Sequence, residues 1–370
     1  MKFKCKKENL ERIFNITERI LNGRKIMNEI LANIFLEAKE DKLVASSTNY
    51  EIFSKQKTNA QIEEQGSLLI PLETLSQMLK YIFDEELEFQ QEGNELILKT
   101  QDHNLKIKGL PIEHYPEIKK VEGEFTCSIN AKEFKIALMQ IVPFCCLSEV
   151  RPELAGILFE FTPTELNLVS TDGARLGIKT LPIQCNAFLS FILVSKTIFE
   201  LIKIIEDEIK EEEIDEKLEI KYNNKMAGFY FKNTEFSSMC INGSFPDWRS
   251  LIPSQVNTSI ICQISRLKNS IGLAGLFASN QNKIILNIET DKLIILSSGS
   301  KVGESQTSIP ISCTGIPMKI TLNWRYLLQG IENIRDEEIQ IDLIDNKSPL
   351  VIKSLGIDKN LIYILAPTEE

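Results

Sequence analysis

The pattern nearest to a chemical motif lies at the end of an apolar run, where Thr171 and Asp172 precede Gly173 and Arg175. An aspartate in this place can act as a general base, a metal ligand or the capping group of a turn. The first two roles require further groups that converge on the carboxylate, whereas a turn requires only local backbone. The rest of the sequence therefore has to supply those partners if the residue is catalytic.

Catalytic and metal-binding motifs are missing elsewhere in the sequence. The two histidines, His103 and His114, form no HExxH pattern, and there is no GxSxG nucleophile elbow and no glycine-rich phosphate loop. The acidic run from Glu206 to Glu216 lacks the periodicity and the glycine of a calcium loop, so a solvated loop is the better interpretation. We therefore expect no metal, no cofactor and no enzymatic activity.

The bulk composition is that of a soluble globular protein. The chain has 370 residues, which suggests two or three domains, with 43% hydrophobic and 25% charged residues. No window resembles a transmembrane span and no apolar segment follows the N-terminal lysines, so we expect a cytoplasmic protein without a membrane partner. The eight cysteines lack metal-ligand spacing and are expected to be reduced and mostly buried.

One pattern occurs three times along the chain. The segments that start at Asn33, Gly156 and Lys283 align without gaps, so that Leu43, Leu166 and Leu293 coincide at spacings of 123 and 127 residues. Each segment is an apolar strand, a polar turn and a second apolar strand, which predicts a hairpin.

The repeated pattern continues on both sides of each hairpin. Helical spacing of apolar residues precedes the hairpins at 8–21, 131–142 and 265–278 and follows them at 71–82, 195–205 and 321–335. Alternating runs broken by a turn come last, at 87–100, 218–231 and 339–354. We therefore predict an α+β fold of three tandem repeats, each with two helices and antiparallel sheet, in domains 1–123, 124–257 and 258–370.

The repeats favour a turn at Asp172. The positions of Thr171 and Asp172 are taken by Thr48-Asn49 in the first copy and by Ser298-Gly299 in the third, and all are turn-forming residues. What distinguishes the second copy is the stretch from Gly173 to Leu176.

The charge of the chain is divided unevenly between its elements. The total of −10 disfavours a nucleic-acid partner at first sight. However, residues 1–25 and the helical segments at 71–82, 131–151, 195–205, 265–278 and 321–335 together carry +10, so the remainder carries −20. Lysines on amphipathic helices can simply face water, but tandem repeats place equivalent helices on equivalent sides, where they can form one basic surface.

Several stretches in order resemble one family, the bacterial sliding clamps, which are the beta subunits of the replicative DNA polymerase III holoenzyme. The stretches are VRPELAGILFEF with LVSTDGARL, then INGSFPDWRSLIP, LNWRYLLQGIENI, SPLVIKS and the terminal YILAP. The resemblance implies three clamp domains that close head-to-tail with a second copy into a ring around double-stranded DNA. Such a ring is a processivity factor in DNA replication: it tethers the polymerase catalytic subunit and binds the clamp loader and other proteins that carry clamp-binding motifs.

The resemblance also assigns a peptide-binding groove between the second and third domains. Its expected residues are Leu154, Thr171, Gly173, Ala174, Arg175, Leu176, Pro246, Ser250, Leu251, Ile364, Leu365, Ala366 and Pro367. Gly173 would let a peptide backbone approach, and Arg175 would donate to peptide carbonyls or pack through its stem. Ala174, Ser250, Ala366 and Glu369 depart from the family pattern.

The same resemblance suggests residues for the two other surfaces. Arg24 and Lys196 match family positions near DNA, and Arg151, Lys25, Lys268 and Arg325 are added because they lie on or beside helices. Leu105 and Ile107 match the family's interface strand, and Leu276 and Phe277 match the opposing helix, although both pairs also suit a core.

Two alternatives remain open from the sequence. A monomeric tandem-repeat scaffold that binds peptides without encircling DNA would share the groove but would not dimerise. A hydrolase that uses Asp172 would lose its activity on Asp172→Asn.

Overall fold

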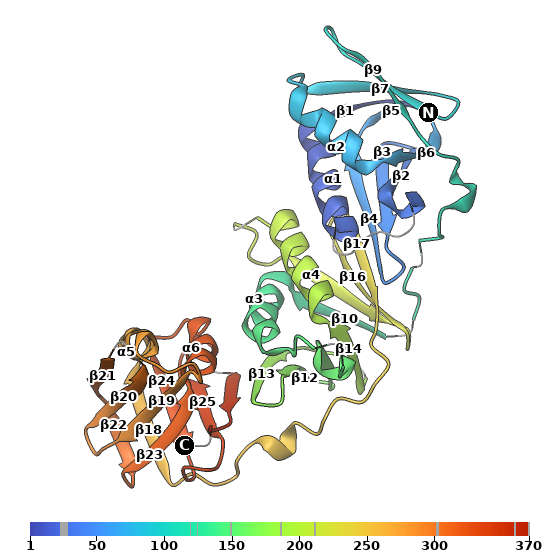
Figure 1. Ribbon diagram of the computed structural model, residues 1–370. Coiled ribbons are helices and arrows are strands. Elements are labelled where there is room, and N and C mark those ends of the chain that lie inside the picture. Colours follow the sequence, from blue (N-terminus) through green and yellow to red (C-terminus); the bar gives the residue numbers. More distant parts are fainter. Residues whose placement is uncertain are drawn as a thin grey trace. The chain divides into compact units, whose positions relative to one another are not determined.

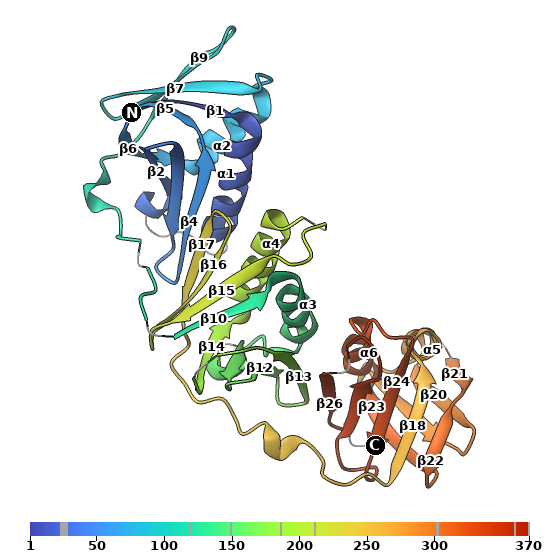
Figure 2. The same cartoon turned by 180° about the vertical axis from the view of Figure 1, so that it is seen from behind.

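The computed structural model describes residues 1–22, 29–118, 120–123, 125–148, 150–185, 187–210, 212–300, 303–358 and 360–368. It divides into two compact units (Figures 1 and 2). The first unit comprises Met1–Lys135 and Lys196–Cys240, and the second comprises Ile136–Ser195 and Ile241–Glu370. Among the described residues, no helix has both the length and the apolar character needed to cross a membrane.

The expected order of elements is observed in all three repeats: a strand, a helix, a set of strands, a second helix and a final set of strands. The first repeat contains β1 (Lys2–Lys6), α1 (Lys7–Asn22), η1 (Glu29–Ala32), β2 (Asn33–Lys39), β3 (Lys42–Thr48), β4 (Ile52–Asn59), β5 (Gln61–Glu64), β6 (Gly66–Pro71), α2 (Leu72–Tyr81), β7 (Glu86–Glu92), β8 (Glu95–Lys99), β9 (Asn104–Lys108) and η2 (Ile112–His114). The expected hairpin is β2–β3.

The second and third repeats follow the same plan. The second contains β10 (Phe125–Asn130), α3 (Ala131–Ile141), η3 (Val142–Phe144), η4 (Pro152–Leu154), β11 (Gly156–Phe161), β12 (Glu165–Thr171), β13 (Arg175–Pro182), β14 (Leu189–Val194), α4 (Ser195–Glu208), β15 (Lys217–Tyr222), β16 (Met226–Phe231) and β17 (Thr234–Met239). The third, after η5 (Arg249–Leu251), contains β18 (Thr258–Gln263), α5 (Ile264–Leu276), β19 (Lys283–Ile288), β20 (Lys292–Ser300), β21 (Gly303–Pro310), β22 (Ser312–Gly315), β23 (Met318–Asn323), α6 (Trp324–Glu332), β24 (Glu338–Leu343), β25 (Leu350–Ser354) and β26 (Leu361–Leu365).

The sheets run continuously from one repeat into the next. The last strand of the second repeat, β17, pairs with β4 of the first, and the last strand of the third, β26, pairs with β13 of the second. These pairings build an eight-stranded sheet in the first unit and a nine-stranded sheet in the second. The middle repeat is therefore shared between the two compact units, and the boundaries near residues 123 and 257 stay a prediction.

Helices of neighbouring repeats lie on the same face of the shared sheet in the first unit. The Thr17 hydroxyl on α1 donates to Gln56 of β4, and the Ser238 hydroxyl on β17 donates to Thr197 of α4 at 3.4 Å. Gln56 lies opposite Thr234, whose side chain is on the same face of β17 as that of Ser238. Figure 1 shows α1 and α2 together on one side of this unit.

The core consists of the apolar residues that the helical and alternating patterns selected. In the first repeat, Leu10, Ile13 and Phe14 of α1 and Leu75 and Leu79 of α2 are buried against the strands. All eight cysteines are free thiols, and five are buried: Cys5, Cys127, Cys145, Cys185 and Cys262. Burial raises the thiol pKa of Cys5, Cys145 and Cys262 to about 12, so these thiols stay protonated at neutral pH.

Candidate functional site

Asp172 caps a tight turn between β12 and β13. Its Oδ1 accepts the backbone N–H groups of Ala174 and Arg175 at 3.0 and 3.1 Å, and its Oδ2 accepts the Arg175 Nε–H at 2.9 Å. Gly173 has a φ of 93°, a conformation that favours glycine. The turn expected from the repeats is confirmed, and both carboxylate oxygens of Asp172 accept hydrogen bonds within it.

Arg175 joins the second repeat to the third. The side chain is 8% exposed. Its Nη1 donates to Gln329 of α6 at 2.6 Å, its Nη2 donates to the Pro143 carbonyl at 3.0 Å, and its guanidinium lies 4.4 Å from the centre of the Tyr326 ring. Of the two roles that the sequence left open, this geometry favours packing, because each guanidinium nitrogen already donates to a group within the protein.

The side chains of β13 divide between the two faces of the nine-stranded sheet. Leu176 and Ile178 lie opposite Ile364 and Ile362 of β26. An apolar cluster covers this face of the sheet and contains Leu158, Val169, Leu176, Ile178, Ile192, Trp248, Val351 and Ile364, with Ile241, Phe245, Ile252 and Ile362 half-buried beside them. We call this surface the groove face.

A segment around η5 packs against the groove face before the chain enters β18. Its Arg249 binds Glu160 of β11 at 2.6 Å and stacks on Trp248, with its guanidinium 4.2 Å from the ring centre. The indole N–H of Trp248 is buried and has no hydrogen-bond partner among the described residues, and Phe245 is only half-buried. The sequence selected Pro246, Ser250 and Leu251 from this segment and missed the two aromatic residues beside them, although large aromatic residues are typical of binding surfaces.

The structure brings together only part of the expected groove set. Leu176 and Ile364 belong to the apolar cluster, and the Ala366 N–H binds the Ala174 carbonyl at 2.9 Å, so the C-terminal stretch reaches the turn. The other expected residues lie outside that cluster: Leu154 is buried in η4, Thr171 binds the Arg175 carbonyl, Leu365 is buried, Pro246 and Pro367 are half-buried, and Ser250 and Leu251 are exposed.

A buried ionic group also holds the second and third repeats together. Asp358, in the third repeat, is fully buried and accepts hydrogen bonds from Arg335, and it lies 3.6 Å from the Lys179 amine of β13. Burial alone would raise the pKa of Asp358, but the hydrogen bonds from Arg335 and Gln140 and the charge of Arg335 together outweigh burial and lower this pKa to about 2. Desolvation lowers the pKa of Lys179, against the opposing effect of Asp358.

The expected DNA-binding residues have different surroundings. Arg24 and Lys25 lie outside the described residues. Lys196 is exposed at the start of α4, Arg151 is exposed 3.3 Å from Glu153, and Arg325 is exposed with its guanidinium 5.4 Å from the Trp324 ring. Lys268 is half-buried and donates to the Glu332 carbonyl at 2.8 Å, which makes it the weakest candidate of the described four.

The positive charge of the helices is partly neutralised within the protein. Arg12 and Arg19 of α1 form ion pairs with Glu208 and Asp207 at the end of α4. The charge division drawn from the sequence therefore overstates the basic surface, because it could not foresee which helix cations have acidic neighbours.

The expected interface residues also fall into two groups. Ile107 on β9 is 7% exposed, and with Leu105 it packs into the core of the first repeat. Leu276 at the end of α5 is 73% exposed, Leu273 one turn earlier is 46% exposed, and Phe277 is intermediate. The residues of β9 thus serve their own core, whereas those of α5 leave apolar surface open.

No cluster of three or more metal-ligating side chains occurs in the part of the chain that the structure describes. Asp172, His103 and the acidic residues after α4 therefore form no metal centre there.

Comparison with known families matches the chain in three consecutive segments. The N-terminal domain of the DNA polymerase III beta subunit matches residues 1–119, its central domain matches 128–247 and its C-terminal domain matches 249–369. Among curated proteins, the beta sliding clamp of Synechococcus elongatus is 23% identical over 376 residues, which cover 100% of this chain and 99% of that protein. The beta sliding clamp of Mycoplasma capricolum is 26% identical over 358 residues, which cover 93% of both chains.

Solved structures show the same fold. The DNA polymerase sliding clamp from Bacillus subtilis has a TM-score of 0.93 at 22% identity and covers 100% of this chain and 99% of its own. The sliding clamp from Pseudomonas aeruginosa bound to griselimycin has a TM-score of 0.93 at 20% identity, with 100% of both chains covered.

Proposed function

The chain belongs to the family of DNA polymerase III beta subunits, the beta sliding clamps, and from this premise we propose that it closes with a second copy into a ring around double-stranded DNA. The ring tethers the replicative polymerase and other proteins to the DNA and so confers processivity. The protein itself performs no chemical reaction, and it works in the cytoplasm.

The pairing of strands between repeats carries the proposal of a ring. The last strand of each later repeat pairs with the strand that follows the hairpin of the preceding repeat, as β17 does with β4 and β26 with β13. The same two positions in the remaining repeats are β9 and β21, and each is an edge strand of its sheet. Because unpaired edges recruit other strands, β9 of one copy is suited to pair with β21 of another, head-to-tail.

The helices support the same closure. At each junction between repeats, the first helix of one repeat faces the second helix of the next. The residues compared below occupy the tenth position counted from the first residue of each helix. Ile16 and Ile204 occupy this position at the first junction and are both fully buried, and at the second junction Gln140 donates to the Asn333 carbonyl at 3.2 Å.

The equivalent pair at the open junction is Leu273 of α5 and Tyr81 of α2. These side chains are 46% and 78% exposed in the isolated chain. A second copy would cover both of them, which explains two large apolar residues in contact with water. The proposal thus keeps the one interface helix expected from the sequence, α5 with Leu276, and adds Leu273 and Tyr81 of α2. Ile107 of the expected interface strand is assigned to the core.

DNA binding follows from the helix-bearing face. Helices α1 and α4 share one face of the eight-stranded sheet, and the exposed Lys196 lies in the first turn of α4. Phosphate contacts from a few such cations give weak, sequence-independent and salt-sensitive binding. Arg24 remains a candidate through the family resemblance, and Lys25 remains one through its place beside a helix expected from the sequence.

The groove face is proposed as the binding site for partner peptides. It offers apolar contacts from Leu176, Ile364 and the half-buried Phe245, next to the turn at Gly173. An added Cβ at Gly173 would meet nothing within 4 Å, so space for a peptide backbone lies beside the turn. The monomeric scaffold would use this groove as well, and only the ring separates the two proposals.

The decisive experiment measures retention on DNA. A clamp loaded by its loader onto nicked circular DNA should stay on the circle through gel filtration and should leave once the circle is cut. Arg24→Ala combined with Lys196→Ala should impair loading more than retention, because retention is topological. Equally fast loss of the protein from intact circles and from linear DNA would rule out encirclement. A hydrolytic activity that is lost in Asp172→Asn would instead support the hydrolase.

A further inference from the structure

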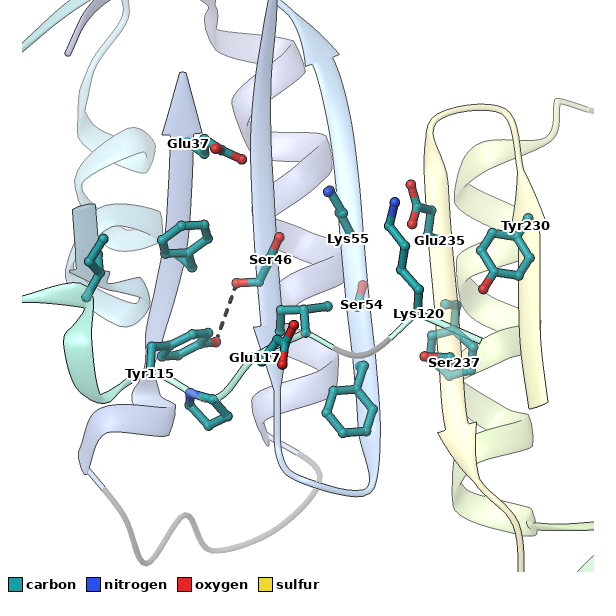
Figure 3. A pocket seen from close by; sticks show the side chains of 16 residues that line it. Glu37, Ser46, Ser54, Lys55, Tyr115, Glu117, Lys120, Tyr230, Glu235 and Ser237 are labelled. Carbon is teal, nitrogen blue, oxygen red and sulfur yellow. Dashed lines mark hydrogen bonds between the residues drawn. The ribbon is translucent and has the colours of Figure 1, made fainter. Parts of the chain in front are cut away.

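A cavity of about 320 Å³ opens on the face of the eight-stranded sheet opposite to α1 and α4 (Figure 3). Its floor is formed by strands of the first and second repeats, and residues of the segment Ile112–Ile118, with Lys120, line one side. Phe35 and Tyr115 stack there with ring centres 6.1 Å apart, and Phe53 lies further along the floor. An apolar cavity of 150 Å³ suffices for a benzene ring, so this one has room for an aromatic side chain.

This cavity occupies the same place in the repeat as the groove face. A shift of 123 residues places Phe53 on Leu176 and Lys55 on Ile178, and it places Phe35 on Leu158 and Ser46 on Val169. Strand pairing extends the match to the last strands, because Ser237 lies opposite Phe53 as Ile364 lies opposite Leu176. The connecting segment with Tyr115 and Ile118 corresponds to the one with Phe245 and Trp248, so the chain contains two versions of one surface.

The two versions differ in charge. Where the groove face has Ile178 opposite Ile362, the cavity has Lys55 opposite Glu235. The Glu235 carboxylate is bound by Lys57 at 2.8 Å. Lys55 is half-buried and forms neither an ion pair nor a side-chain hydrogen bond among the residues that the structure describes, and the exposed Lys120 lines the same cavity. The carboxylates of Glu37 and Glu117 also line the cavity, so it presents both positive and negative charges to an occupant.

The cavity does not end at the connecting segment. A second cavity of about 490 Å³ is lined by Met226 and Met239 and shares Glu117, Ile118 and Lys120 with the first. Two cavities along one stretch of chain suit an extended occupant better than a compact small molecule.

We propose that this cavity binds an extended segment of a partner protein, whose aromatic side chain enters beside Phe53 and whose neighbouring acidic residue pairs with Lys55. That the occupant is a peptide rests on the proposed function of the equivalent groove face. The existence of the cavity and its charge are independent of that function. Partners with different clamp-binding segments then occupy the two surfaces of one protomer at the same time.

The test uses the full-length protein with ¹³C-labelled isoleucine δ1 methyl groups. The probes are two capped pentapeptides of the same length, acetyl-Gly-Asp-Phe-Gly-Ser-amide and acetyl-Gly-Lys-Phe-Gly-Ser-amide. Methyl NMR titration reports the cavity through Ile112 and Ile118 and the groove face through Ile178 and Ile364. The aspartate peptide should shift the cavity methyls saturably, and the lysine peptide should bind about threefold more weakly there.

Two variants of the cavity sharpen the test. Lys55→Met removes the charge and keeps most of the aliphatic stem, so it should abolish the difference between the two peptides. Ser237→Leu fills the floor with a side chain like the one at Ile364, so it should weaken both peptides. A thermal midpoint and an oligomeric mass like those of the parent show that each variant is folded.

A variant of the groove separates this proposal from the one on which it rests. Phe245→Ala should weaken peptides that bind the groove face and leave the shifts of Ile112 and Ile118 intact. Shifts confined to Ile178 and Ile364, unsaturable shifts at Ile112 and Ile118, or an undiminished preference for aspartate in Lys55→Met would each overturn the proposal.

Discussion

At the scale of single residues, the stretch that resembles an active site is a structural joint. Asp172 holds the turn and the guanidinium of Arg175, and Arg175 in turn holds α6 through Gln329 and Tyr326. Both side chains are mostly buried, with 8% of Arg175 and 14% of Asp172 exposed. Their hydrogen bonds and charges therefore join two repeats, and the effect of losing them on the free energy of unfolding can be measured.

Arg175→Ala should lower the free energy of unfolding of the unit that contains the third repeat by about 3 kcal/mol, because it leaves buried polar partners unsatisfied. Urea denaturation followed by tryptophan fluorescence measures this loss, since Trp248 and Trp324 both lie in that unit. The control is Arg249→Ala, whose ion pair with Glu160 is more exposed, and which should cost less than about 1 kcal/mol. Equal losses in the two variants would contradict the joint.

Asp358 makes acid stability a second residue-scale prediction. Its folded pKa of about 2 lies below the usual value of about 3.9 for an unfolded aspartate, so its contribution is complete above that value and disappears as the pH falls toward 2. The contribution is on the order of 2 to 3 kcal/mol at neutral pH.

Urea unfolding at pH 7, 4 and 3 measures this effect. Asp358→Asn should be less stable at pH 7 and should lose less stability on acidification than the parent, because the titrating carboxylate is gone. If the free energy of unfolding fell equally with pH in the two proteins, acid unfolding would be due to other carboxylates.

At the scale of elements, the groove face is a sheet surface partly covered by a connecting segment. Its anchors are in strands β11 to β14, β25 and β26, while Phe245 and Trp248 come from the segment around η5. Leu176 is 2% exposed, so a charge at this position would disrupt the fold as well as any peptide site. The half-buried Phe245 is a better probe.

A peptide of the family's Gln-Leu-x-Leu-Phe kind should bind the protein with roughly micromolar affinity, which corresponds to about −8 kcal/mol. Phe245→Ala and removal of the last five residues should each weaken this binding by about tenfold or more, because each removes apolar contact from the groove. Fluorescence anisotropy with a labelled peptide measures the change. Leu273→Ala, which alters apolar surface on α5 instead, is the matched control and should bind like the parent.

At the scale of the whole molecule, the open ends of the repeat series determine the assembly. Leu273→Asp or Leu276→Asp should give folded monomers of 42.2 kDa in place of a dimer of twice that mass, because both side chains are exposed in the isolated chain. Light scattering coupled to gel filtration measures the mass. Ile107→Asp should instead unfold the first repeat, since Ile107 is buried in its core. A folded Leu273→Asp variant that remains dimeric would place the interface elsewhere.

The sequence by itself determined the repeated order of elements. Apolar spacing located both helices and the hairpin of every repeat, and the turn chemistry of Thr48-Asn49 and of Asp172 marked the ends of β3 and β12. The turn expected at Ser298-Gly299 was wrong, because β20 continues through these residues to Ser300. These signals are local, because side-chain periodicity and turn propensity depend on neighbours within a few residues. The family of the chain followed from motifs spread along its whole length.

The tertiary structure alone decided which repeats share a sheet and which charged side chains are paired within the protein. The pairings β17–β4 and β26–β13 join residues far apart in sequence, and local periodicity says nothing about which strands meet. The same holds for Arg12 and Arg19, whose acidic partners come from α4, and for Arg175, whose partners Pro143 and Gln329 come from distant segments. A sequence shows where a charged side chain begins, but only the fold places another group within the few ångströms over which it can be bound.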